Sequence, residues 1–198
     1  MAHQERPEAW VKLPSDAEAH AAVGGETLPY ETLMGGVVLR ITRLILAHRL
    51  LGKALLNHIK VVMFGPGALS RAEREMVAAV TSAAQNCHYF TYHHTEFLRV
   101  EGGDPALAEA IRHHRWREVV ELTERQRALC MLAEKLSSTP TRMVREDWQP
   151  LRHLDFDDRA CLEVAHIVCL FNYLIRLAEG FGLQPTEAKS TYEQVTVS

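Results

Sequence analysis

Three side chains between Leu69 and His94 have the chemistry for thiol or acid–base catalysis: Glu75, Cys87 and His94. On a helix that starts near Cys87, His94 lies seven residues later on the same face. The first turn of a helix presents unpaired backbone N–H groups and the positive end of the dipole, and both favour a thiolate. A carboxylate brought beside a thiol and an imidazole makes a proton relay possible. We therefore take these three residues as the candidate catalytic set.

Each member of this set also has an ordinary structural interpretation. A cysteine without a partner is often a buried, inert residue, a single histidine is often only hydrogen-bonded, and Glu75 could be a solvated charge. The nearby pair His93–His94, with His88, could suggest a metal site. Adjacent histidines point to different sides of a helix, however, and too few ligands remain. We expect no metal and no cofactor.

The elements that would position these residues are two consecutive helices. Ser70 and Glu73 form a capping box, S-x-x-E, in front of an apolar run with helical spacing. Asn86 is a residue type that tolerates a helix-ending turn. Cys87 would then open a second helix, which runs to about Val100.

Helical spacing continues through most of the chain. One segment runs from Tyr30 to Phe64, with Gly52 as the point where it kinks or ends, and others begin at Asp104 and Thr123. A last long helix begins near Asp157 and is apolar most of the way round. No stretch alternates with period two, so the predicted fold class is all-α.

Composition and charge narrow the classes of protein to which this chain can belong. The chain has 198 residues and a formal net charge of -3, so no basic field would attract nucleic acid. The N-terminus does not resemble a secretory signal, and charged residues interrupt the longest apolar run, 35–65, so we expect no membrane span. No two of the four cysteines have C-x-x-C spacing. Buried or half-buried thiols are typical of a reducing cytoplasm.

We divide the chain into an irregular N-terminal arm (1–29), a helical domain (30–184) and a polar C-terminal tail (185–198). The arm would lie on the surface or on a partner subunit, and a flexible tail is an equal alternative. The apolar faces of 37–64 and 157–177 exceed what one thin bundle buries easily. This excess predicts a homo-oligomer.

Several of these segments resemble one family. LSRAERE, the twelve-residue step from Glu75 to Cys87, and NCHYFTYHH resemble the AhpD-like superfamily (alkylhydroperoxidase D and carboxymuconolactone decarboxylase), most closely its peroxidase-related branch. The segments GGDPALAEAIR, LTERQRALCMLAEKL and AHIVCLFNYLIRLAEGFGL extend the resemblance over roughly residues 30 to 184. It implies a helical bundle built around a two-helix unit, assembled as dimers, trimers or hexamers.

The resemblance also implies roles for the candidate residues. The motif of the family is E-x11-C-x-x-C-x3-H, in which the second cysteine attacks peroxide, the first resolves the product, and the Glu and His relay protons. By this match Glu75 is the acid, Cys87 the resolving thiol and His94 the histidine, while Phe90 replaces the attacking cysteine. The two-cysteine cycle cannot run without that thiol. The other cysteines lie on helices that we expect in the core: Cys130, Cys161 and Cys169.

Three functions therefore remain open from the sequence. The first is a peroxidase-like oxidoreductase that reduces a small peroxide with Cys87 alone and is recycled by an external thiol. The second is a cofactor-free acid–base enzyme of the carboxymuconolactone decarboxylase type, acting on a small lactone through the Glu75–His94 relay. The third is a non-catalytic oligomeric binding protein.

Overall fold

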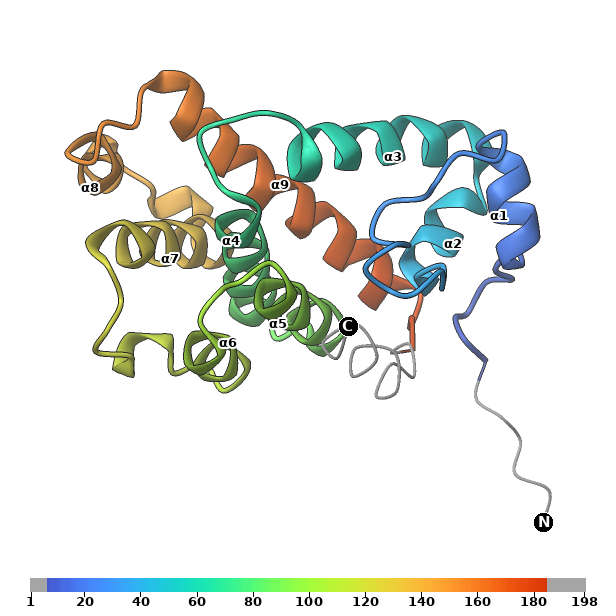
Figure 1. The fold of residues 1–198 in the computed structure, drawn as a ribbon, viewed down its shortest axis with the longest axis horizontal. Coiled ribbons are helices and arrows are strands. Elements are labelled where there is room, and N and C mark those ends of the chain that lie inside the picture. Colours follow the sequence, from blue (N-terminus) through green and yellow to red (C-terminus); the bar gives the residue numbers. More distant parts are fainter. Residues whose placement is uncertain (1–6, 185–198) are drawn as a thin grey trace, which may run out of the picture. The chain divides into compact units, whose positions relative to one another are not determined.

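The computed structural model describes residues 7–184, which form nine α-helices and no β-strand (Figure 1). The predicted all-α class is therefore confirmed. Within the described range, contacts divide the chain into two compact units, 7–59 with 176–184, and 60–175. Two long helices, α3 (Arg49–Phe64) and α9 (Asp158–Gly180), each contribute residues to both units. All the candidate catalytic residues belong to the second unit.

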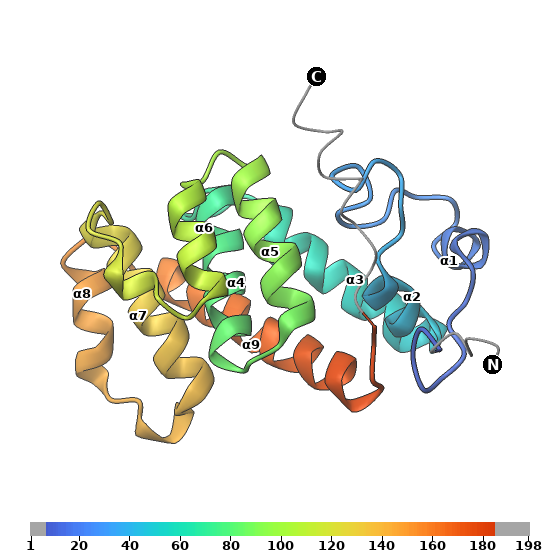
Figure 2. The same ribbon diagram turned by 90° about the horizontal axis from the view of Figure 1, so that it is seen from below.

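The second unit is built on the pair α4 (Arg71–Ala84) and α5 (His88–Val100), which pack against each other more extensively than any other two helices (Figures 1 and 2). The next helix, α6 (Pro105–Arg112), packs on α5, and α7 (Glu124–Ser138) packs on α4. Residues 74 to 83 of α4 are all buried. Many of them are alanine or valine, so neighbouring helices can approach α4 on every side.

The predicted start signals of these helices are confirmed. Ser70 and Glu73 form a reciprocal capping box at α4, and Thr123 and Gln126 form another at α7. Asp104 caps α6 by accepting a hydrogen bond from the backbone N–H of Ala106. These caps satisfy backbone donors that a helix start leaves unpaired.

Short elements complete the second unit. Between α6 and α9 the chain forms, besides α7, three 3₁₀ turns and one short helix: Trp116–Glu118, Pro140–Arg142, Arg145–Trp148 and α8 (Gln149–Arg152). Residues 158–175 of α9 belong to this unit. Asn172 of α9 donates a hydrogen bond of 3.0 Å to the hydroxyl of Ser137 at the end of α7.

The first unit contains α1 (Asp16–Ala22) and α2 (Arg40–Leu46). Backbone hydrogen bonds tie its two ends together: Trp10 donates to Phe181 at 2.8 Å and Gln184 donates to Glu8 at 2.9 Å. The described part of the predicted arm is irregular except for α1. That helix begins with a Ser15–Glu18 capping box, the same S-x-x-E signal used at α4. The predicted C-terminal tail, 185–198, lies outside the described residues.

The prediction of one helical segment from Tyr30 to Phe64 with a break at Gly52 is wrong. Turns occupy its first part, where Tyr30 and Gly36 have positive φ angles of 64° and 89°. The break between α2 and α3 falls at Ala47–His48, and Gly52 lies inside α3. A Cβ on Gly52 would lie 2.9 Å from Cα of Leu46. Gly52 therefore lets α3 approach α2 closely instead of ending a helix.

Within the described residues, α9 is the one helix that is long and apolar enough to cross a membrane, with a mean hydropathy of 1.6 over its most apolar window. Half of that window is buried inside the protein. The core helix of a soluble protein meets the same two criteria.

Candidate functional site

The structure brings Glu75 and His94 together in the interior, on adjacent faces of α4 and α5. Nδ1 of His94 lies 2.6 Å from Oε2 of Glu75. The exposed fraction of the side chain is 3% for His94 and 0% for Glu75. The other oxygen of Glu75, Oε1, accepts a hydrogen bond from the guanidinium of Arg71 one turn earlier on α4. A carboxylate that holds Nδ1–H of an imidazole leaves Nε2 as the basic nitrogen.

Three phenylalanine rings surround His94. Phe90 stacks on the imidazole with centroids 5.9 Å apart, while Phe97 and Phe171 meet it edge-on at 5.6 and 4.3 Å. Two of these rings come from α5 and the third comes from α9. Sequence reasoning did not single out Phe171, although the run of apolar residues in its helix placed it in the core. The histidine is thus in an apolar environment, where its hydrogen bond to Glu75 is electrostatically stronger than in water.

Cys87 is the N-cap residue of α5, one position before the first helical turn. Asn86, with φ of 55°, makes the turn between the helices, and the N–H of Cys87 donates to the carbonyl of Ser82 at 3.0 Å. Cys87 is completely buried and Phe90, one turn later, is 3% exposed. The position of the second cysteine in the motif is therefore filled by a packed ring, which closes this part of the site to solvent.

None of the four cysteines forms a disulfide. Burial, with a smaller contribution from Glu134, raises the pKa of Cys130 to about 12. Burial also raises the pKa of Cys161. Cys169 is exposed on α9, which contradicts the expectation that it lies in the core. The helix presents this side to solvent, so of the three cysteines outside the candidate set only Cys130 and Cys161 are buried.

His93 lies on a different side of α5 from His94. Its ring packs against Tyr89 and Phe97, at centroid distances of 4.7 and 6.2 Å. Burial, together with the neighbouring His94, lowers the pKa of His93 to about 3. Its imidazole is therefore neutral at physiological pH. Among residues 7–184, no group of three or more His, Cys, Asp or Glu side chains is arranged to hold a metal ion.

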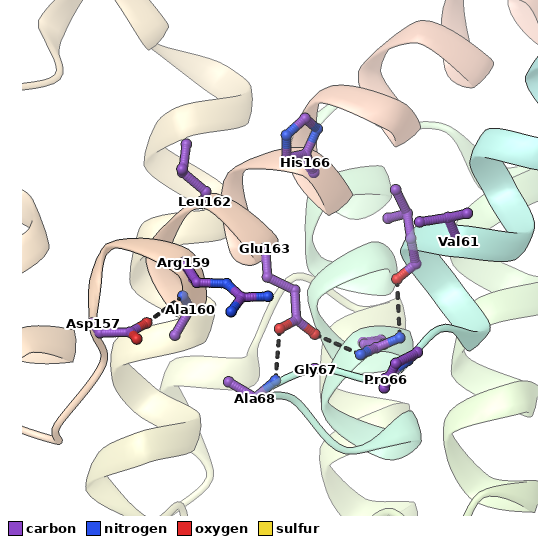
Figure 3. A pocket seen from close by; sticks show the side chains of 12 residues that line it. Val61, Pro66, Gly67, Ala68, Asp157, Arg159, Ala160, Leu162, Glu163 and His166 are labelled. Atoms are coloured by element: carbon purple, nitrogen blue, oxygen red, sulfur yellow. Dashed lines mark hydrogen bonds and ion pairs between the residues drawn. The ribbon is translucent and has the colours of Figure 1, made fainter.

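A separate pocket of about 580 Å³ lies between the 65–69 loop and the start of α9 (Figure 3). Glu163 accepts hydrogen bonds from the N–H groups of Ala68 and Leu69, at 2.7 and 3.3 Å, and pairs with Arg74 at 2.6 Å. Arg74 in turn donates to the carbonyl of Gly65 at 2.7 Å. These contacts fasten the loop to α9, and none of the candidate catalytic residues lines the pocket.

Comparison with known proteins places the candidate residues inside a segment that matches a known family. Residues 49–135 match the model of the carboxymuconolactone decarboxylase family, and this segment includes Glu75, Cys87 and His94. The match covers the segment with the candidate residues, so it is this segment that is similar to the carboxymuconolactone decarboxylase family. No curated protein matches the chain significantly.

Solved structures of the same fold cover nearly the whole chain. A peroxidase-related protein from Silicibacter sp. superposes with a TM-score of 0.80 and 23% identity, covering 97% of this chain and 100% of that one. An AhpD-core peroxidase-related protein from Ralstonia eutropha gives 0.76 and 24%, covering 92% and 94%. A cysteine-to-alanine variant of the debrominase Bmp8, in complex with 2,3,4-tribromopyrrole, gives 0.76 and 16%, covering 93% and 96%. At these identities the likeness establishes the fold.

Proposed function

We propose that this protein is a thiol-based, peroxidase-like oxidoreductase in which Cys87 is the reacting thiol and Glu75–His94 is the proton relay. The observation that carries the proposal is the buried hydrogen bond between Glu75 and His94, in the two-helix unit whose second helix starts at Cys87. In the family motif Cys87 matches the resolving thiol. Here it takes the attacking role, because Phe90 has replaced the other cysteine.

The reaction balances with an external thiol as reductant. The Cys87 thiolate attacks the terminal oxygen of a hydroperoxide, so an S–O bond forms, the O–O bond breaks and the sulfur is oxidised to a sulfenic acid. His94 first accepts the thiol proton of Cys87 and then delivers it to the leaving alkoxide, which becomes an alcohol. A small thiol then attacks the sulfenic acid and releases water as a mixed disulfide forms. A second thiol displaces Cys87 and restores it.

The surroundings of His94 favour an apolar substrate. Three aromatic rings contact its imidazole, so an organic hydroperoxide with a hydrocarbon body fits this environment better than hydrogen peroxide does. The debrominase of the same fold, crystallised with a small aromatic ring, is consistent with an aromatic ligand. We therefore choose cumene hydroperoxide as the test substrate.

The direct test is to trap the sulfenic acid. Protein treated with cumene hydroperoxide and dimedone is digested and mapped by mass spectrometry, with Cys87→Ser and Cys169→Ser as matched variants. We expect a dimedone adduct on the Cys87 peptide that survives Cys169→Ser, and a rate lowered at least about tenfold in His94→Gln. An adduct on Cys169 alone would contradict the proposal, since that thiol is exposed and needs no relay.

A second candidate is a non-catalytic oligomeric protein, and the observation that favours it is the burial of Phe90 against His94. In that case Glu75–His94 is a structural hydrogen bond. The trapping experiment separates the two candidates, because the second predicts no oxidation of Cys87. No observation on the described residues favours the lactone decarboxylase alternative.

We also propose that the protein is a cytoplasmic homo-oligomer. Within the second unit, Val61, Leu162 and Tyr173 are large apolar side chains with exposed fractions of 62%, 58% and 50%. Such a surface is typical of an interface between subunits. Light scattering coupled to size-exclusion chromatography gives the molar mass, and Leu162→Glu is expected to lower it. A molar mass of one chain for the wild type would contradict the proposal.

A further inference from the structure

We propose that two copies of this chain pair through the exposed face of α9, with the two helices antiparallel and Cys169 on the two-fold axis. The inference rests on the proposed homo-oligomer and deepens it, because it names the surface, the orientation of the helices and the contacts across the axis. The surface, which we call the α9 seam, consists of four exposed side chains: Leu162, His166, Cys169 and Tyr173.

The spacing and composition of the α9 seam are those of a helix face that meets another helix. Its members follow one another at steps of four, three and four residues, as core positions of a coiled coil do. Leu162 and Tyr173 have exposed fractions of 58% and 50%. No Asp, Glu, Lys or Arg occurs between Glu163 and Arg176, although a stripe of helix in contact with water ordinarily carries charges. The seam therefore fits a partner surface better than it fits solvent.

Charges at the two ends of the seam select an antiparallel pair. Arg159 lies ten residues before Cys169 and Glu179 lies ten residues after it, and both are exposed on the same continuous helix. At about 1.5 Å per residue, each is about 15 Å from the position of Cys169. An antiparallel pair centred on Cys169 places Arg159 of each copy at the height of Glu179 of the other. A parallel pair would place like charges at the same height, which is unfavourable.

The same arrangement gives the apolar side chains of the seam a complementary neighbour. Tyr173 of one copy falls between Leu162 and His166 of the other. Arg176 comes to the height of Leu162 of the other copy, where the aliphatic part of its side chain can cover the leucine. Leu162 and His166 also line the pocket beside Val61, and they project from α9 away from the ion pair of Glu163 (Figure 3). The contact is self-complementary, as a two-fold interface must be.

The two-fold axis has a consequence that can be measured, because Cys169 of one copy meets Cys169 of the other. Packed helices lie about 8–10 Å apart, so facing backbones at the axis come within the range of a disulfide. Cys169 is exposed and unbonded within one chain. Copper–phenanthroline in air removes two electrons and two protons from the two thiols, and an S–S bond between the chains forms. We expect a covalent dimer on a non-reducing gel, and none in Cys169→Ser.

Moving the thiol tests the direction of the helices. In a Cys169→Ser background, Leu162→Cys puts a thiol seven residues from the axis, so the two copies of it lie about 20 Å apart in an antiparallel pair. We expect no covalent dimer from this variant. Efficient cross-linking at position 162 would indicate parallel helices and would overturn the inference.

Charge exchange tests the pairing at the ends without a thiol. Arg159→Glu sets like charges at the same height at both ends of the pair, and we expect the dissociation constant to rise at least about threefold in analytical ultracentrifugation. The double variant Arg159→Glu with Glu179→Arg restores opposite charges and is expected to recover the wild-type value. A double variant as weak as the single one would contradict the antiparallel pairing.

Failure of this inference is distinct from failure of the proposed function. A wild-type oligomer whose Cys169 gives no covalent dimer would overturn the α9 pairing and leave the homo-oligomer in place. A molar mass of one chain, with or without co-sedimentation on phosphatidylcholine vesicles, would overturn both, and co-sedimentation would assign the seam to a membrane surface. Sulfenic acid trapping on Cys87 reports on the peroxidase proposal alone, because Cys87 does not belong to the seam.

Discussion

The ring of Phe90 stacks on the imidazole of His94, with centroids 5.9 Å apart and planes inclined by 20°. Phe90 also meets Phe171 edge-on at 5.8 Å. Phe90 is therefore part of the hydrophobic core and contacts His94 directly. Any thiol placed at this position would lie one helical turn after Cys87 and beside His94.

Phe90→Cys is expected to create a peroxide-dependent disulfide with Cys87, because the substitution restores C-x-x-C at the start of a helix. Peptide mapping under non-reducing conditions measures the bond. The cavity left by the ring is expected to cost about 3–4 kcal/mol of unfolding free energy. Phe90→Ala makes a similar cavity without the thiol. A folded Phe90→Cys protein that forms no disulfide would show that the two positions are not within bonding reach.

Glu75→Gln is expected to lower the free energy of unfolding by about 3 kcal/mol, because it leaves the charge of Arg71 without its buried partner. Urea denaturation measures the change. Glu73→Gln is the matched control on the same helix. Glu73 is partly exposed and glutamine can keep its place in the capping box, so we expect a loss below about 1 kcal/mol. Equal losses in the two variants would contradict a special role for the Arg71–Glu75–His94 cluster.

His93 is expected to make the protein less stable in acid. Burial lowers its pKa to about 3 in the folded state, against 6.5 for an ordinary histidine. Below pH 6.5 the unfolded chain binds a proton that the folded protein does not, so stability falls as the pH decreases from about 6.5 towards 3. The limiting slope is about 1.4 kcal/mol per pH unit.

His93→Phe removes this contribution and should flatten the pH dependence of the unfolding free energy in that range. Denaturation curves at several pH values provide the measurement. The exposed His113→Phe serves as the control and should keep the wild-type slope. Carboxylates titrate alike in all three proteins, so the difference between variants isolates His93. A wild-type slope in His93→Phe would assign the acid sensitivity to other groups.

Gly67→Ala is expected to destabilise the 65–69 loop by about 1–3 kcal/mol. A Cβ at this position would lie 2.5 Å from Oε1 of Glu163 and 2.6 Å from Nη2 of Arg74, so the ion pair between them would have to move. Gly180→Ala is a suitable control, because a Cβ there meets no atom within 4 Å. Thermal unfolding of both variants tests the difference. Equal melting temperatures would mean that the pair adjusts without cost.

The sequence determined the fold class and most helix starts, and it singled out Glu75 and His94, which the structure brings into contact. Capping boxes and apolar periodicity are local signals, so Ser70, Asp104 and Thr123 mark their helices correctly. The same local signal, S-x-x-E at Ser15, would have identified α1. The role of Gly52 could not be read this way, because the contact that requires it is between two helices.

Only the tertiary structure decided what surrounds the candidate residues. Spacing along a helix places Phe90 and His94 on one face, but it does not tell whether that face meets solvent, an open pocket or a ring such as Phe171. Spacing also cannot show that Arg71 pairs with a buried Glu75, because the burial of Glu75 comes from the other helices. Packing also decided that Cys169 lies on the solvent-exposed side of α9. The sequence shows which reactive residue types share a helix face, while burial and charge neutralisation depend on residues far apart in the chain.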